Sequence, residues 1–383
     1  EIKNKMKKIV LIANSCWYIY NFRLSLLKEI SSKDNIVIII APKDNYTKIL
    51  IDLGYEVYPW KLQRSSINPL KEIKSIFNLM DIIDSISPDL IHNFTIKSCL
   101  YGTIASKFCS IPIVVNSITG LGPLFINNSL KIKLIRLFLK PIYKFVFNSS
   151  NSYTIFQNTS DQKFFLDFRI INNLKKSFLI EGSGVDTELF KPFKDINSGF
   201  NKPLKLLFPS RLIREKGIIE VLDAHKRLLE KGENIQLLIA GEIDKGNIST
   251  LLNEQKNSLK TNKNIKIFGH IADMKDIYSQ SDIVILPSWR EGLSKSLIEA
   301  GAMEKPIITC DVPGCREIIE HGINGILVPL KNAKALELAI VFLIRNKNIA
   351  KQYGRKIRLK VKERFDIRII NKKTIGVYKK IYF

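Results

Sequence analysis

The 383-residue sequence has few residues that bind metals or form disulfides. Its five cysteines are scattered and odd in number, and no two form a Cys-x-x-Cys pair, which argues for a reducing compartment and against structural zinc. The four histidines are isolated, and neither His-x-x-x-His nor Asp-x-Asp occurs. We therefore expect no metal site.

Long apolar runs are missing as well. No stretch approaches the ~20 apolar residues of a transmembrane helix. Near the start, Lys7 and Lys8 precede an apolar run at 9–13 that is too short for a signal peptide and is typical of a first strand. The sequence thus predicts neither a leader nor a membrane span, and its length is ample for two or three domains.

Acidic residues are outnumbered, with 36 Asp and Glu against 60 Lys and Arg, which gives a net charge of +24. Such a charge fits an anionic partner, either nucleic acid, anionic lipid or a diphosphate substrate. Lysine-rich codon bias is an alternative origin, because Asn and Ile are also abundant. The basic residues are spread over both halves and no nucleic-acid-binding motif is found, so we do not expect nucleic acid as the partner.

What the sequence does contain is a regular alternation of strand-like apolar runs and helical patterns. This alternation predicts an α/β protein with two doubly wound parallel sheets. A polar, non-periodic stretch with Pro and Gly separates the two series and is expected to be a linker. The predicted domains are 1–190 and 203–350, with the linker at 191–202 and a basic helical segment at 351–383. The predicted strands are 9–13, 36–40, 90–92, 113–116, 153–156, 204–208, 235–240, 265–268, 283–286, 306–309 and 325–328.

The most informative segment is 287–300, Pro-Ser-Trp-Arg-Glu-Gly-Leu-Ser-Lys-Ser-Leu-Ile-Glu-Ala. It follows a predicted strand and leads into a helix that begins near Ser294. Gly292 permits a close backbone approach, and the amides of Leu293 and Ser294 lie at the helix N-terminus. This arrangement favours binding of an anion such as a diphosphate.

Two carboxylates and two cations accompany this turn. Glu291 precedes it and Glu299 follows in the helix, and because carboxylates repel phosphate, their expected partners are sugar hydroxyls. Arg211 and Lys216 follow another strand, 204–208. Ligands of open parallel sheets bind outside the carboxyl ends of the strands, so the set predicts a nucleotide-sugar pocket. An ordinary strand–turn–helix with solvated glutamates is the alternative.

These residues resemble a known family. Glu291 and Glu299, with seven residues between them, match the paired-glutamate motif of retaining glycosyltransferase family 4. Segments 211–217 and 311–317, the latter Asp-Val-Pro-Gly-Cys-Arg-Glu, also match that family. The resemblance covers essentially the whole chain and is strongest over 204–330.

The resemblance implies the GT-B architecture, two Rossmann-like domains facing a cleft, with the donor site in the second domain and the C-terminal helix returning to the first. The absence of Asp-x-Asp agrees, because metal-dependent glycosyltransferases of the other major fold typically use that motif. Within the family, 290–300 and 118–122, Ile-Thr-Gly-Leu-Gly, look most like bacterial enzymes that extend polyprenyl-diphosphate-linked sugars for O-antigen, capsule or glycoprotein glycans.

The family motifs also imply roles for single residues. Arg211 and Lys216 would neutralise the diphosphate leaving group, Glu291 would support the sugar-like transition state, and Glu299 would bind the ribose. For His270 a plain loop histidine is the alternative. The other donor-side residues expected are Gly269, His270, Ile271, Gly292, Leu293 and Ser294, and the acceptor-side residues are Ser15, Thr119 and Gly120.

The sequence departs from many relatives in two places. They often have a glycine pair after the first strand, where this chain has 14–17, Asn-Ser-Cys-Trp. They also often have a histidine after the fourth strand, where Thr119 is the nearest match. A retaining reaction can use the leaving phosphate as base, so no protein general base is assigned.

A basic and apolar segment stands apart from these motifs. No acidic residue occurs between Asp89 and Asp161, and within this interval 129–147 mixes basic with large apolar residues. It is too apolar for a solvated face and too charged to span a bilayer, so it suits a helix on an anionic membrane. An amphipathic helix packed on the first sheet is the alternative, and Pro141 is expected to break or kink the helix. The membrane-facing residues expected are Lys131, Lys133, Arg136, Lys140 and Lys144.

Together these features predict a retaining, metal-independent hexosyl- or N-acetylhexosaminyltransferase without a cofactor, since the UDP-sugar is a substrate. Its acceptor is expected to be a lipid-linked, polyprenyl-diphosphate saccharide at the cytoplasmic face of the inner membrane. The alternatives are a same-fold enzyme acting on a glycerolipid or another acceptor and a basic nucleic-acid-binding protein. A glycogen-type phosphorylase is disfavoured, because the chain is short and no pyridoxal-lysine context is found.

Overall fold

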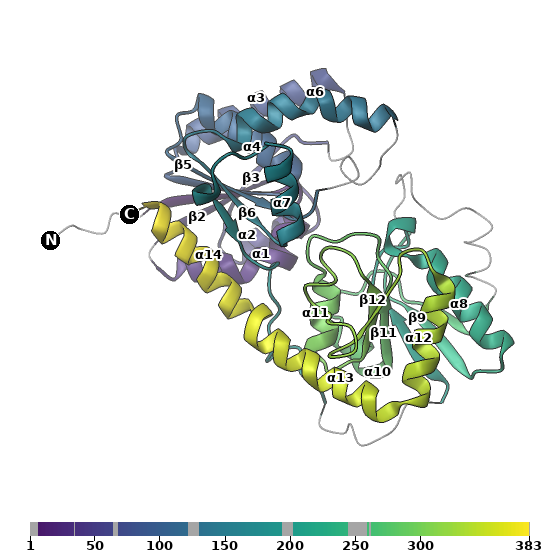
Figure 1. The fold of residues 1–383 in the computed structure, drawn as a ribbon. Helices are drawn as coiled ribbons and strands as arrows, with labels where there is room; N and C mark the ends of the chain where they lie inside the picture. Colours follow the sequence, from purple (N-terminus) through teal and green to yellow (C-terminus); the bar gives the residue numbers. More distant parts are fainter. Residues whose placement is uncertain are drawn as a thin grey trace. The chain divides into compact units, whose positions relative to one another are not determined.

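The computed structural model describes residues 7–33, 35–63, 68–121, 130–193, 202–243, 259 and 262–382, and of residues 130–138 the backbone only. The chain forms two compact units, shown in Figure 1. One unit comprises Glu1–Ser183 and Ile370–Phe383, and the other comprises Gly184–Ile369. Each contains its own parallel sheet, which confirms the prediction of two Rossmann-like, doubly wound domains.

The first unit contains a seven-stranded sheet in the order β3-β2-β1-β4-β5-β6-β7, with every neighbouring pair parallel. The order reverses at β1, so a topological switch point lies between β1 and β4, where ligands of such sheets bind. The strands are β1 Lys8–Ile12, β2 Ile36–Ala41, β3 Glu56–Pro59, β4 Leu90–Phe94, β5 Ile113–Ile118, β6 Ser152–Phe156 and β7 Ser177–Leu179.

Helices cover both faces of this sheet, because its strands alternate between two apolar cores. In β1, Ile9 and Leu11 pack in one core, whereas Val10 and Ile12 pack in the other. Figure 1 shows α3, α4 and α6 together on one side. The helices are α1 Cys16–Ser31, α2 Tyr46–Asp52, α3 Pro69–Ile86, α4 Ile96–Phe108, α6 Leu130–Phe147, α7 Thr159–Asp167 and, at the end of the chain, α14 Ile367–Tyr382, with a 3₁₀ turn η1 Leu174–Lys176.

The end of the chain belongs to the first unit. Ile370, Ile375, Val377 and Tyr378 of α14 are buried in the same core as α1 and β1. The boundaries of the compact units therefore fall at other positions than the predicted ones: the first unit ends at Ser183, before the predicted 190, and 351–383 is divided between the units. Much of the predicted linker, 194–201, lies outside the described residues.

Backbone pairing explains why the division falls after Ser183. The Val185 N–H donates to the Phe365 carbonyl at 3.0 Å, and the Ile367 N–H donates to the Val185 carbonyl at 3.0 Å. The Thr187 hydroxyl also donates to the Asp366 carboxylate at 2.6 Å. These contacts attach the segment after Ser183 to the second unit.

The second unit contains a six-stranded parallel sheet in the order β10-β9-β8-β11-β12-β13. Its strands are β8 Leu204–Phe208, β9 Ile235–Ile239, β10 Ile265–Ile267, β11 Ile283–Leu286, β12 Ile307–Cys310 and β13 Ile326–Val328. Its helices are α8 Ile218–Glu230, α10 Lys275–Gln280, α11 Lys295–Ala302, α12 Ala333–Arg345 and α13 Lys347–Lys360, with a 3₁₀ turn η2 Arg214–Lys216 and a π-helical turn η3 Val361–Phe365.

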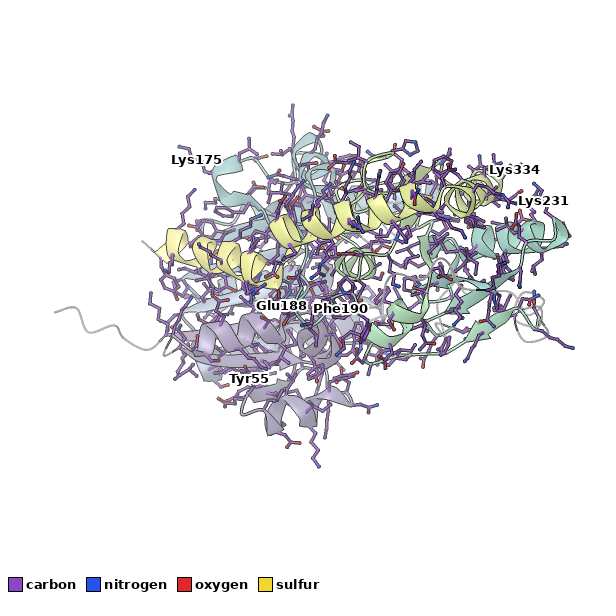
Figure 2. The ribbon with its side chains drawn as sticks, turned by 90° about the horizontal axis from the view of Figure 1, so that it is seen from below. Tyr55, Lys175, Glu188, Phe190, Lys231 and Lys334 are labelled. Atoms are coloured by element: carbon purple, nitrogen blue, oxygen red, sulfur yellow. The ribbon has the colours of Figure 1, made fainter. Side chains whose placement is uncertain are left out.

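Helices α8 and α12 pack together through apolar residues and one buried charge. Glu337 of α12 is fully buried and forms an ion pair with Lys231, just after α8. It forms a second ion pair with Lys334, whose Nζ lies 3.4 Å from the carboxylate. Figure 2 labels both lysines, which lie near each other at one end of this unit. None of the described helices is both long and apolar enough to cross a membrane.

Candidate functional site

The candidate site lies where β8 and β11, which are neighbours in the second sheet, reach their carboxyl ends. The loop after β8 leads to Lys216, and the turn after β11 leads to Glu291. The Lys216 Nζ lies 2.5 Å from the Glu291 Oε1, and the two side chains are only 19% and 13% exposed. The structure thus brings together two residues that are 75 positions apart in the chain, as a largely buried ion pair.

Backbone hydrogen bonds hold the turn that carries Glu291 between two other loops. The Trp289 N–H donates to the Glu215 carbonyl at 2.8 Å, and the Glu291 N–H donates to the Pro313 carbonyl at 3.1 Å. The three sequence segments that resemble the family, around Lys216, Glu291 and Pro313, therefore meet at one edge of the sheet.

Two glycines allow this close approach. Gly217 has a φ of +79°, and a Cβ there would lie 2.2 Å from the Pro287 carbonyl oxygen. Gly314 has a φ of +82°, and a Cβ there would lie 2.4 Å from the Glu291 carbonyl oxygen. Since backbone atoms cannot rotate away as side chains do, only glycine fits at either position.

The N-terminus of α11 differs in detail from the expectation. The Ser294 amide, which we expected to face an anion together with the Leu293 amide, donates to the Gly314 carbonyl at 3.3 Å. Gly292 and Ser294 are buried, and Leu293 is half-buried. The carbonyl of the neighbouring loop thus meets the Ser294 amide, because that loop packs directly on the turn, and the expected anion contact of the Leu293 amide stays a prediction.

Glu299 is buried inside the second unit. Its carboxylate accepts a hydrogen bond from the Tyr278 hydroxyl at 3.2 Å and lies 3.5 Å from the Lys295 Nζ. Burial raises the pKa of Glu299, and the neighbouring Lys295 and Tyr278 offset part of this effect. Its expected contact with a ribose stays a prediction.

The remaining donor-side residues lie further along the sheet. Gly269, His270 and Ile271 follow β10, the edge strand, and His270 is exposed. The His270 backbone N–H lies 3.3 Å from the Glu242 carboxylate, its acceptor. Arg211 is exposed at the end of β8.

The acceptor-side residues lie in the first unit and are not adjacent. Ser15 follows β1 and accepts the Tyr18 N–H at 3.1 Å as the N-cap of α1. Thr119 and Gly120 follow β5, which β4 separates from β1 in the sheet. Gly122 lies outside the described residues.

Sequence reasoning did not identify a buried polar cluster between the sheet and α14. The two ring nitrogens of His92, on β4, lie 2.5 Å from the Tyr378 hydroxyl and 2.7 Å from the Ser117 hydroxyl. Burial, with the nearby Arg23 adding to it, lowers the pKa of His92 well below its usual value, so the imidazole is neutral. The signal in the sequence was the polar pair His92-Asn93 inside an otherwise apolar strand.

Within the basic segment 129–147, the structure describes helix α6, Leu130–Phe147, which continues through Pro141. The expected break at Pro141 was therefore wrong, and the kink, its alternative, stays a prediction. Tyr143, Val146 and Phe147 are buried in the first unit and hold the last turns in place. Lys140 and Lys144 are half-buried, and the side chains of Lys131, Lys133 and Arg136 lie outside the described residues.

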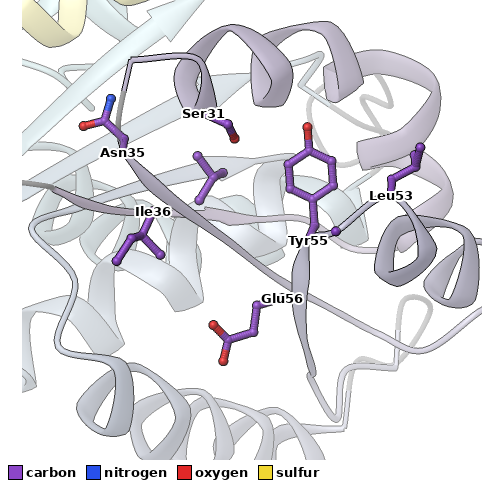
Figure 3. Close-up of a pocket in the computed structure, with 8 residues that line it drawn as sticks. Ser31, Asn35, Ile36, Leu53, Tyr55 and Glu56 are labelled. Atoms are coloured by element: carbon purple, nitrogen blue, oxygen red, sulfur yellow. The ribbon is translucent and has the colours of Figure 1, made fainter.

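A separate surface hollow of about 400 Å³ opens in the first unit, shown in Figure 3. It lies at the amino ends of β2 and β3, the edge opposite to the ligand-binding edge of a parallel sheet. We therefore do not assign it to the candidate site. It is lined by Ser31, Asn35, Ile36, Val37, Leu53, Gly54, Tyr55 and Glu56. Among the residues that the structure describes, no three His, Cys, Asp or Glu side chains group closely enough to hold a metal ion.

Two protein families match this chain. The family described as glycosyl transferases group 1 matches residues 190–360, and the family described as glycosyl transferase 4-like matches residues 8–159. A crystal structure of a glycosyltransferase from Rickettsia africae superposes with a TM-score of 0.77 at 21% identity, over 99% of each chain.

Two relatives are similar in sequence over most of the chain. The Campylobacter jejuni N,N'-diacetylbacillosaminyl-diphospho-undecaprenol alpha-1,3-N-acetylgalactosaminyltransferase is 30% identical over 342 residues, which cover 86% of this chain and 88% of that protein. The Escherichia coli UDP-Gal:alpha-D-GlcNAc-diphosphoundecaprenol alpha-1,3-galactosyltransferase is 25% identical over 292 residues, which cover 72% and 71%.

Proposed function

The chain belongs to the family 4 glycosyltransferases and has their GT-B fold, and from this premise we propose that it moves a hexose or N-acetylhexosamine from a UDP-sugar to a polyprenyl-diphosphate-linked saccharide, with retention of configuration. One observation carries the donor half of this proposal. Lys216 and Glu291 are held together at the carboxyl ends of β8 and β11 by the three motif loops.

Charge complementarity supports this assignment of the donor end. As the bond between the anomeric carbon and the diphosphate oxygen breaks, negative charge grows on the leaving UDP, and Lys216 and Arg211 neutralise it. Glu291 accepts hydrogen bonds from sugar hydroxyls and stabilises the positive charge on the sugar. The acceptor hydroxyl forms the new bond on the same face, and its proton passes to the departing phosphate.

The acceptor half of the proposal rests on the relatives. The Campylobacter jejuni and Escherichia coli enzymes are both named for sugars linked to undecaprenyl diphosphate. This chain covers most of the length of each, and it matches the family in both halves. We therefore assign a lipid-linked saccharide of the same class as the acceptor.

A lipid-linked acceptor requires contact with a membrane, and the outer helices of the first unit have suitable chemistry. Three apolar side chains on one stripe of α3 are exposed: Leu70 by 72%, Ile73 by 48% and Phe77 by 59%. On α6, Ile142 and Phe145 are 43% and 50% exposed. Both helices pack against α4, and large apolar groups exposed on them favour insertion at a membrane interface.

The charge on this surface is positive where the apolar stripe begins. Glu72, the acid in the first turn of α3, is paired with Lys97 at 3.1 Å and accepts the Tyr101 hydroxyl at 2.5 Å. Its charge is thereby compensated within the protein, while Lys71 and Lys74 on the same helix are exposed. Such a surface suits anionic lipid headgroups, and it supports our proposal that the enzyme acts peripherally at the cytoplasmic face of the inner membrane.

A transfer assay tests the proposed function. The purified chain is incubated with UDP-N-acetylgalactosamine, UDP-galactose or UDP-glucose and a polyprenyl-diphosphate-linked sugar. UDP release and product mass are measured, and the anomeric configuration of the new linkage is read from NMR coupling constants. We expect the acceptor to gain one sugar in the same anomeric configuration as in the donor. Transfer to diacylglycerol but not to the polyprenyl acceptor would identify a glycerolipid enzyme instead.

A further inference from the structure

The ion pair between Lys216 and Glu291 has a consequence for ligand selection. The Glu291 carboxylate is paired with the Lys216 ammonium group at 2.5 Å, so the cation that would bind a diphosphate already has a partner. Both side chains are shielded from solvent. The same two groups lie close to the buried Cys315 thiol: burial raises its pKa, Glu291 raises it further and Lys216 lowers it. The pair is therefore a shielded part of the site rather than a contact between two exposed surface side chains.

We propose that Glu291 makes the site select an intact sugar nucleotide over the free nucleoside diphosphate, by competing with the diphosphate for Lys216. This inference rests on the proposed function of the site. A diphosphate that approaches Lys216 must come close to the Glu291 carboxylate, which repels it, or must separate the two charges and leave the carboxylate unpaired. Both routes weaken the binding of a nucleotide that has no sugar.

A sugar-bearing donor removes this penalty. Its hydroxyls donate hydrogen bonds to Glu291 and replace the partner that the carboxylate loses when Lys216 turns to the phosphate. Free UDP has no sugar on its terminal phosphate and so offers Glu291 no such hydroxyls. The repulsion between the carboxylate and the diphosphate therefore remains. After transfer the product UDP loses the compensating sugar, and its release is favoured.

Rigid loops make this competition effective. The Glu291 backbone is fixed by the Pro313 carbonyl and by contact with Gly314, and the turn that carries Lys216 is fixed to Trp289. The backbone of Glu291 therefore stays in place when a ligand binds, and the carboxylate charge continues to act on the diphosphate even when Lys216 turns to the phosphate. A carboxylate on a mobile loop would move away from the diphosphate and would not discriminate between the sugar nucleotide and free UDP.

Titration calorimetry with UDP, pyrophosphate and UDP-N-acetylgalactosamine tests the proposal. We expect Glu291→Gln to bind UDP and pyrophosphate roughly three- to tenfold more tightly than the wild type, because the neutral amide neither repels phosphate nor pairs strongly with Lys216. The preference of the wild type for the sugar nucleotide over UDP should shrink in this variant. If Glu291→Gln folds poorly, Glu291→Ala replaces it in the same experiment. The quantity compared is again the ratio of the affinities for the sugar nucleotide and for UDP.

Glu320→Gln is the matched control, because Glu320 also forms an ion pair, with the Lys360 Nζ at 2.6 Å, and its loss changes the net charge equally. It should bind UDP like the wild type. If UDP binds Glu291→Gln no more tightly than the wild type, the competition is disproved while the donor site stands. If no nucleotide binds the wild type or either variant, the proposed function fails as well.

Discussion

Two residues of the candidate site, Lys216 and Glu291, give the clearest prediction for activity. Replacing Lys216 with Ala removes a cation that opposes charge on the leaving diphosphate, and replacing Glu291 with Gln removes a negative charge that stabilises the sugar. Each change should lower the rate of sugar transfer by about 10²–10³. Glu291→Gln should remain folded, since the amide oxygen still accepts a hydrogen bond from Lys216. Full activity in either variant, measured as UDP release, would exclude the roles assigned here.

Glycine geometry gives a second prediction with a built-in control. Gly314 and Gly322 both have positive φ, +82° and +75°, but only a Cβ at Gly314 would meet neighbouring atoms, the backbone of Glu291. Both alanine variants should lose about 1 kcal/mol of stability from the strained backbone, and Gly314→Ala should lose more, because its Cβ also meets the Glu291 backbone. Gly314→Ala should also displace Glu291 and lower transfer roughly tenfold or more.

Gly322→Ala should keep its transfer rate. Unfolding curves and UDP release, measured on the same preparations, separate the two effects. Equal transfer by the two variants would show that the loop around Gly314 does not position Glu291.

At the scale of the elements, the junction before α14 predicts a dependence of stability on pH. Burial alone would raise the pKa of Asp366, but hydrogen bonds from Arg368 and Thr187 outweigh it and lower the pKa to about 2. The folded value lies below the unfolded one, so the carboxylate stabilises the fold above about pH 4, and this contribution is lost as the pH falls toward 2.

Asp366→Asn should therefore destabilise the chain by roughly 1–2 kcal/mol at pH 7, and the difference from the wild type should shrink below about pH 4. Urea unfolding at a series of pH values measures this. Asp311→Asn is the control, since Asp311 is 60% exposed in its ion pair with Arg316. A difference that stays constant down to pH 3 would contradict the assigned cause.

The sequence predicted elements better than contacts. Runs such as Ile36–Ala41 and Leu204–Phe208 are apolar enough to be buried on both faces, so the parallel sheets follow from the pattern alone. Helix α6 was harder to predict, because Pro141 indicated a break or a kink. Its continuation depends on the buried residues after Pro141, and their packing is decided by other parts of the chain.

The sequence indicated which residues belong to the candidate site but not which of them contact one another. The residues at the ends of β8 and β11 could be listed because ligands meet such ends. That Lys216 pairs with Glu291 depends on which strands are neighbours, and that the Ser294 amide meets Gly314 depends on the packing of a third loop. His92 and Tyr378, 286 positions apart, could not be paired by any local pattern.

At the scale of the whole molecule, catalysis is predicted to be independent of metal ions. The sequence has no Asp-x-Asp, and Arg211 and Lys216 offer the positive charge that a metal would otherwise bring to the diphosphate. Turnover should therefore survive EDTA without loss. If EDTA abolishes UDP release and Mg²⁺ or Mn²⁺ restores it, the donor end of the site has been assigned wrongly.

Membrane docking also belongs to the whole molecule, because it combines net charge with one exposed surface. The chain has a net charge of +24, and the outer helices of the first unit expose large apolar side chains. Electrostatic attraction to lipid is screened within about 8 Å at physiological salt, whereas apolar insertion is not. Binding to anionic liposomes should therefore weaken as salt rises but keep a salt-resistant part, and binding to neutral liposomes should be poor.

Two sets of substitutions separate these contributions. Changing Lys131, Lys133, Arg136, Lys140 and Lys144 together to Gln should remove most of the salt-sensitive binding, since each basic residue contributes about 1 kcal/mol near an anionic surface. Changing Leu70, Ile73 and Phe77 to Ser should remove the salt-resistant part. The control variant changes three apolar residues of the second unit to Ser, namely Ile323, Leu330 and Leu338, whose side chains are 49%, 43% and 54% exposed. It should sediment with liposomes like the parent.

Activity completes this test, because docking should matter only when the acceptor is in a membrane. Both docking variants should transfer sugar slowly to a long-chain polyprenyl acceptor in liposomes, yet act normally on a short-chain soluble acceptor, since Lys216 and Glu291 lie in the second unit. If both variants still sediment with anionic liposomes as the parent does, α3 and α6 are ordinary packing helices, and the membrane contact must be sought on another surface of the molecule.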